Sequence, residues 1–111
     1  MNLGVDVQRR GEWVVITPLG DVDMGSAPGL RQEVIRTVAA GDTRIVFDLG
    51  SVDFIDSVGL GVVIGALRRT RANGGDVVLA RVPDSVAEVL ALVELDRILT
   101  IHADIDDAVA S

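Results

Sequence analysis

Short apolar runs alternate with segments of helical periodicity along this chain, and that alternation limits the folds it can adopt. Trp13 to Leu19, Arg44 to Leu49 and Asp76 to Ala80 are short and rich in Val, Ile, Leu or Phe, which is typical of buried strands. Helical stripes separate these runs. Strand–helix–strand units connect by right-handed crossovers, so the sequence predicts an α/β fold with a mostly parallel sheet.

The two ends of the chain complete this pattern. Leu3, Val5 and Val7 alternate with polar residues, and a turn at Arg10-Gly11-Glu12 would pair this strand with the next as an antiparallel hairpin. A short last strand is expected at Ile98 to Ile101, followed by a terminal helix at 104–110. The predicted order is β-β-α-β-α-β-α-β-α in one domain over residues 1–111.

Boundary signals place the helices between these strands. Ser26 is expected to cap the first helix, with Pro28 in its first turn and Gly41 at its end. Its apolar stripe comprises Ala27, Leu30, Val34 and Val38. Asn73-Gly74-Gly75 ends the second helix. Ser85 and Glu88 have the spacing of a capping box at the start of the third.

Composition excludes several classes of function. The chain has no cysteine, which rules out disulfides, cysteine-ligated metals and a thiol nucleophile. Its net charge of −7 and pI near 4.4 argue against binding nucleic acid or an anionic membrane. The N-terminus lacks the features of a signal peptide, and no apolar run reaches the roughly 18 residues of a membrane span. We therefore expect a cytoplasmic protein without a cofactor.

The segment after Ser57 predicts a helix with an unusual outer face. Leu60, Val63, Ile64 and Leu67 form the stripe that should face the sheet. Val58, Val62, Gly65 and Arg69 point roughly the opposite way. Two interpretations of these small and apolar residues stay open: a neighbouring element covers them, or they form a docking surface that a partner can approach closely.

Asp56 and Ser57 stand where a strand ends and this helix begins. The simplest interpretation is helix capping. The functional alternative is phosphorylation of Ser57, because a helix N-terminus offers free N–H groups and partial positive charge to a phosphate. Asp56 and the Asp21-Val22-Asp23 loop, if it lies nearby, would oppose that charge.

Catalysis and metal binding have little support. His102 is the only histidine and lies far along the chain from Ser57, and there is no Tyr or Lys to serve as another base. The glycines at 59, 61 and 65 miss the nucleotide-binding spacing by one residue. Asp104, Asp106 and Asp107 are interpreted as charges at a helix start.

These motifs together resemble the STAS domain, specifically the bacterial anti-sigma factor antagonists. The resemblance rests on Asp56-Ser57-x-Gly59-Leu60-Gly61 after an apolar strand, Gly20-Asp21-Val22-Asp23 after the second strand, and Asn73-Gly74-Gly75 before the fourth. It spans the whole chain. It implies a small sheet with helices packed mainly on one side. Val58 replaces a common second Ser or Thr, and Glu94-Leu95 replaces a common Gly-Leu pair.

The resemblance also implies a mechanism. The unphosphorylated protein would bind an anti-sigma factor that is itself a GHKL-type serine kinase, and so free a sigma factor. Phosphorylation of Ser57 would stop binding until a PP2C-type phosphatase reverses it, with Asp23 near both the phosphosite and the partner. The expected partner-binding residues are Asp21, Asp23, Asp56, Ser57, Val58, Gly59, Gly61, Val62 and Gly65. The alternative is a non-switching STAS scaffold of a stressosome or transporter.

Overall fold

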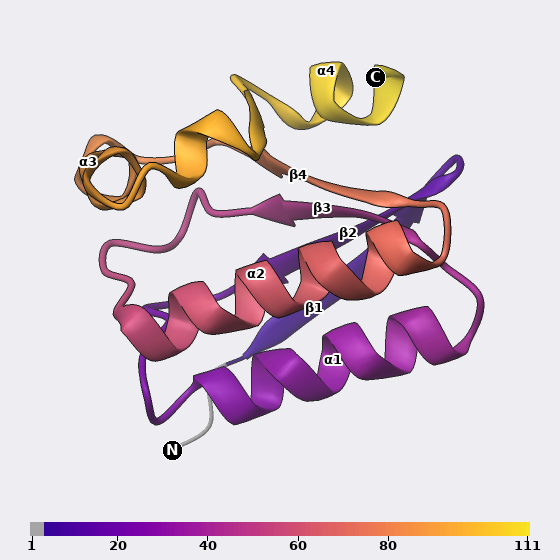
Figure 1. The fold of residues 1–111 in the computed structure, drawn as a ribbon, viewed down its shortest axis with the longest axis horizontal. Coiled ribbons are helices and arrows are strands. Elements are labelled where there is room, and N and C mark those ends of the chain that lie inside the picture. The colour runs from indigo at the N-terminus through magenta and orange to yellow at the C-terminus, as the bar shows by residue number, and fades with distance from the viewer. Residues whose placement is uncertain (1–3) are drawn as a thin grey trace.

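The computed structural model describes residues 4–111 as a five-stranded sheet with helices on both faces (Figure 1). The strands are β1 (Val5–Arg10), β2 (Trp13–Pro18), β3 (Arg44–Asp48), β4 (Asp76–Ala80) and β5 (Thr100–His102), side by side in that order. β1 and β2 are antiparallel, and the other pairs are parallel. The predicted fold class is confirmed, hairpin included. Leu3 lies outside the described residues.

The helices divide the core in two. They are α1 (Ala27–Ala39), α2 (Ser57–Ala72), α3 (Asp84–Leu92) and α4 (Ile105–Ala110). Side chains of α1, α2 and α3 belong to one large apolar cluster with one face of the sheet, which contains Phe47 and Ile16. α4 packs on the opposite face through Ala108, against a smaller cluster that contains Trp13 and Val46 (Figure 1). Helices therefore pack mainly on one side, as expected.

Both predicted helical stripes face the core. Ala27, Leu30 and Val34 of α1 are buried, with Val38 partly buried. In α2, Leu60, Val63 and Leu67 are buried and Ile64 is partly buried. α1 ends where Gly41 takes a φ of +94°, a conformation that glycine adopts without strain.

Two local predictions were wrong in detail. The predicted capping box at Ser85 does not form: Pro83 holds the N-cap position, and the Ser85 hydroxyl donates to the Asp53 carbonyl at 3.0 Å. The segment predicted as a strand at 98–101 instead follows a 3₁₀ turn, η1 (Leu95–Arg97), and the strand begins two residues later. In the edge strand β1, Val5 is partly buried and Val7 is 41% exposed.

The longest helix among residues 4–111 has 16 residues, and none there is long and apolar enough to cross a membrane.

Candidate functional site

Two loops meet at one edge of the sheet, where β2 and β3 end (Figure 1). Because neighbouring parallel strands end at the same edge, the segments that follow them lie side by side. The Val22 N–H donates to the Phe54 carbonyl at 3.0 Å, and the Asp56 N–H donates to the Val22 carbonyl at 3.1 Å. Val22 and Ile55 thus form a parallel bridge. This brings the acidic 21–23 loop to the start of α2.

Asp56 holds the two loops and the helix together. It is the N-cap of α2, and its Oδ1 accepts a hydrogen bond from the Gly59 N–H at 2.9 Å. Its Oδ2 accepts another from the Met24 N–H, also at 2.9 Å. One carboxylate therefore satisfies a free N–H donor at the start of α2 and anchors the loop after β2 that contains Met24.

Ser57 is the first residue of α2 and is exposed. No hydrogen bond joins its hydroxyl to any residue in the described part of the chain, 4–111. Within the same range, the backbone N–H groups of Ser57 and Val58 are also free of protein acceptors. Of the two residues considered for capping, only Asp56 caps the helix. Within residues 4–111, the Ser57 side chain makes no hydrogen bond that supports the fold.

The other acids are fixed by the loop backbone. Asp23 Oδ1 accepts from the Gly25 N–H at 3.0 Å and the Ser26 N–H at 3.1 Å, and Asp21 Oδ1 accepts from the Asp53 N–H at 3.3 Å. Ser26 takes the N-cap position of α1, as predicted. Its hydroxyl does not cap the helix, however, and instead accepts from the Asp23 N–H at 3.0 Å and donates to the Asp21 carbonyl at 2.9 Å.

The electrostatic environment of Ser57 is negative. None of the ion pairs formed among residues 4–111 involves Asp21, Asp23, Asp53 or Asp56. Their charges are moderated by backbone N–H donors and by the start of α2, and are not neutralised by arginine.

Gly59 allows the loop after β2 to pack closely against the start of α2. It is buried, and a Cβ atom on it would lie 2.6 Å from the Val22 carbonyl oxygen and 2.7 Å from Val22 Cγ1. Glycine is therefore required for the 21–24 loop to approach α2. Gly61, two residues further along α2, is exposed, and a Cβ there would meet nothing within 4 Å.

The expected exposure of Val62 was wrong. It is only 3% exposed, because α1 lies against this side of α2 and Val34 and Val62 belong to one cluster. The interpretation that a neighbouring element covers this face therefore holds for Val62, and Val62→Arg would place a charge inside the interface between the helices. Val58 is 39% exposed, Gly65 is half-buried, and Arg69 is exposed.

Sequence reasoning missed two exposed apolar side chains beside Ser57. Met24 is 73% exposed and Phe54 is 53% exposed, on the two segments that Asp56 connects. The signal for Phe54 was available: successive side chains in an extended segment point to opposite sides, so Phe54 and Ile55 could not both face the core. Ile55 is the buried member of that pair.

The same edge carries no metal centre within residues 4–111, where no three His, Asp or Glu side chains are placed to hold an ion. His102, the only histidine, lies on β5 and lines a hollow bordered by Trp13 and Val78, side chains of the cluster that packs against α4.

Comparisons with known proteins agree with this geometry. The STAS domain family model matches residues 4–108. The anti-sigma-B factor antagonist of Bacillus subtilis is 31% identical over 104 residues, which are 93% of this chain and 94% of that protein. A crystal structure of a candidate anti-sigma factor antagonist from Thermotoga maritima superposes with a TM-score of 0.91 at 27% identity, covering 96% of this chain and 92% of that one.

Bacillus SpoIIAA in its phosphorylated form shares the fold, with a TM-score of 0.77 at 23% identity over 96% of this chain and 97% of that one.

Proposed function

The chain belongs to the STAS domain family, within the anti-sigma factor antagonists, and on that premise we propose that it is a partner switch controlled by phosphorylation of Ser57. The observation that carries the proposal is that Asp56 and Ser57 have different roles at the start of α2. Asp56 makes both structural hydrogen bonds, and the neighbouring Ser57 hydroxyl is exposed. A modification of Ser57 can therefore change the surface without removing a contact that maintains the fold.

A phosphate on Ser57 would be stabilised by the helix start and repelled by the neighbouring carboxylates. The N–H groups of Ser57 and Val58 and the positive end of the α2 dipole can stabilise it. The phosphate adds a charge of about −1.5 to −2 beside Asp23 and Asp56. The local fold can accommodate this group, while a partner docked over the acidic edge would meet a strongly altered field.

The proposed docking surface combines acids with exposed apolar side chains. Met24, Phe54 and Val58 supply apolar area around Ser57, and Asp21 and Asp23 supply charge. Exposed Gly61 and half-buried Gly65 extend the surface along α2. Gly59 and Val62 are buried, so their role would be to hold the loop and α1 in place behind it.

The proposed partner is an anti-sigma factor of the GHKL-type serine kinase class, with a PP2C-type phosphatase as the opposing enzyme. The names of the relatives, which are antagonists of anti-sigma factors, support an anti-sigma factor as the partner. The kinase and phosphatase classes rest on the motif resemblance around Asp56-Ser57.

The direct test is incubation of the purified chain with a GHKL-type anti-sigma kinase of its source organism and ATP. Intact mass spectrometry should show one added phosphate on wild type and none on Ser57→Ala. Ser51→Ala is the matched control, because Ser51 is an exposed serine in the same β3–α2 segment. Phosphorylation of wild type and Ser51→Ala but not of Ser57→Ala supports the proposal. Equal phosphorylation of Ser57→Ala would refute it.

The affinity arm uses the same kinase without ATP. Unmodified protein should bind it, and phosphorylated protein should bind at least tenfold more weakly. Tight binding that phosphorylation leaves unchanged would favour the non-switching scaffold.

A further inference from the structure

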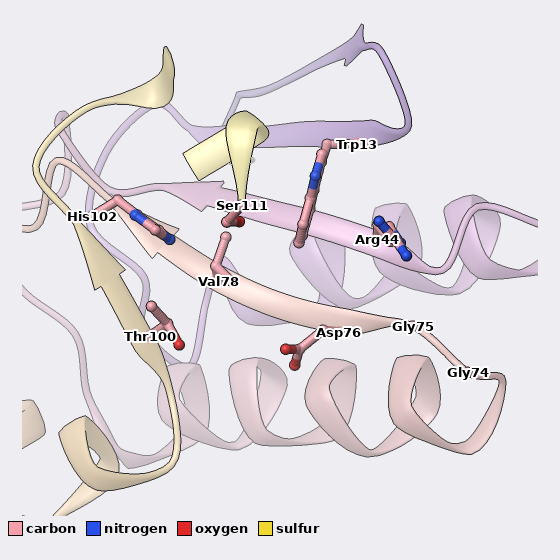
Figure 2. A pocket seen from close by; sticks show the side chains of 9 residues that line it. All are labelled: Trp13, Arg44, Gly74, Gly75, Asp76, Val78, Thr100, His102 and Ser111. Atoms are coloured by element: carbon pink, nitrogen blue, oxygen red, sulfur yellow. The ribbon is translucent and has the colours of Figure 1, made fainter. Parts of the chain in front are cut away.

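A hollow of about 290 Å³ lies on the sheet face that carries α4 (Figure 2). α4 covers the apolar side chains of Val46 and Ala80 there through Ala108. It does not cover the amino-terminal part of the strands, so Val78 forms part of the lining. The hollow is thus separate from the two loops around Ser57, which follow the carboxyl ends of β2 and β3.

One side of the hollow is aromatic and positively charged. The guanidinium carbon of Arg44 lies 5.9 Å from the centre of the Trp13 indole ring, and Figure 2 shows both side chains on the same flank. Arg44 also pairs with Glu12 at 3.4 Å. Since a guanidinium carries five N–H donors, this ion pair leaves others free.

The other side consists of hydrogen-bonding groups on β5. His102 Nε2 is buried and has no hydrogen-bond partner among residues 4–111. Thr100 lies two residues earlier on the same strand, so both side chains point to the same face of the sheet. In Figure 2 they stand opposite Trp13, with Val78 and Ser111 between them. Buried polar atoms in native proteins nearly always have a partner, which makes the orphaned Nε2 a sign that something polar binds there.

The dimensions and chemistry of the hollow select a class of ligand. Trp13 and Thr100 lie on β2 and β5, three strand spacings apart in the sheet, or about 14 Å at roughly 4.8 Å per strand. Two donors at one end, an apolar floor and an aromatic wall fit a flat ring that carries an acceptor group. Asp76, on the rim, accepts from the Arg71 side chain at 3.3 Å and the Val77 N–H at 2.9 Å, which reduces its repulsion of an anion.

We propose that this hollow binds a small aromatic carboxylate. The carboxylate accepts hydrogen bonds from His102 Nε2–H and the Thr100 hydroxyl. The ring rests on Val78 and against the Trp13 indole, and Arg44 contributes positive charge. The inference does not depend on the proposed switch at Ser57.

The chain offers two unambiguous reporters, because Trp13 is its only tryptophan and His102 its only histidine. Benzoate, titrated into the full chain, should shift the single indole N–H and the imidazole signals in NMR spectra saturably, with a dissociation constant on the order of 1 mM. Benzamidine, the cation of the same shape, and benzyl alcohol, the neutral analogue, should each bind at least tenfold more weakly.

Thr100→Val removes one donor at nearly constant shape and should weaken benzoate about tenfold. Ile101→Val is the matched control: the adjacent residue of β5 points to the other face, and benzoate affinity should be unchanged. The melting temperature of each variant reports its fold. The proposal is overturned if benzoate causes no saturable shift in wild type, if benzamidine binds as tightly, or if Thr100→Val binds benzoate like wild type.

Discussion

Replacement of Asp56 by alanine tests the division of labour between Asp56 and Ser57. The change removes the N-cap acceptor for Gly59, which costs about 1 kcal/mol. It also removes the acceptor for the Met24 N–H, a bond on the exposed side of the site that contributes about another 1 kcal/mol. We expect Asp56→Ala to lower the free energy of unfolding by about 2 kcal/mol. Unfolding entropy of roughly 2.1 cal/mol/K per residue over 111 residues converts this to about 9 °C in Tm.

Two companion variants separate the two hydrogen bonds of Asp56. Asparagine caps helices as well as aspartate does, so Asp56→Asn should keep the bond from Gly59. Its amide nitrogen would face the Met24 N–H as a second donor, and we expect a loss of about 1 kcal/mol. Ser57→Ala should change stability by less than about 0.5 kcal/mol, because the serine side chain makes no contact of this kind among residues 4–111.

Urea denaturation followed by circular dichroism measures all three. The expected order of stability is wild type and Ser57→Ala together, then Asp56→Asn, then Asp56→Ala. If Ser57→Ala loses as much as Asp56→Ala, the hydroxyl is structural and the reasoning fails.

Three further outcomes are expected. Gly59→Ala should lose about 1–3 kcal/mol through overpacking against Val22, whereas Gly61→Ala, in open space, should be neutral or stabilising by up to about 1 kcal/mol; equal effects in thermal melts would contradict the packing argument. Glu94→Gly should stabilise the chain by about 0.5 kcal/mol, because Glu94 has a φ of +60°, and a lower melting temperature would count against it. Ser57→Glu should weaken binding of the anti-sigma kinase while leaving the melting temperature within about 2 °C, and calorimetry measures both; a large loss of stability would make Ser57 structural.

The parts of the fold that follow from local pattern could be predicted from the sequence. Runs such as Ile45-Val46-Phe47 are short, apolar and rich in β-branched residues, which favours buried strands, and the i, i+3, i+4 spacing from Leu60 to Leu67 defines one helix face. Glu94 illustrates a more informative case. The motif resemblance implies a glycine in that turn, and Glu94 occupies it here in the left-handed conformation.

Predictions failed where a long-range contact competes with a local motif. Ser85 has the spacing of a capping residue, yet its hydroxyl donates a hydrogen bond to the Asp53 carbonyl instead. Val62 lies off the stripe that faces the sheet, but α2 has two buried faces because α1 packs beside it. A single helical pattern shows which residues are apolar and does not show how many neighbours will cover them.

Under the proposed phosphorylation of Ser57, the start of α2 separates the modified residue from the residue that holds the fold. The phosphoacceptor of a switch must be exposed to a kinase, and it must also lie close to groups that the partner contacts. Asp56 meets the structural requirement with both of its oxygens, since one holds α2 and the other holds the 21–24 loop. Ser57 is then free to change. If the cap and the acceptor were one residue, each phosphorylation would also remove a helix cap worth about 1 kcal/mol, and loss of binding would be mixed with loss of stability. Their separation onto adjacent residues predicts that phosphorylation changes partner affinity by a larger free energy than it changes stability.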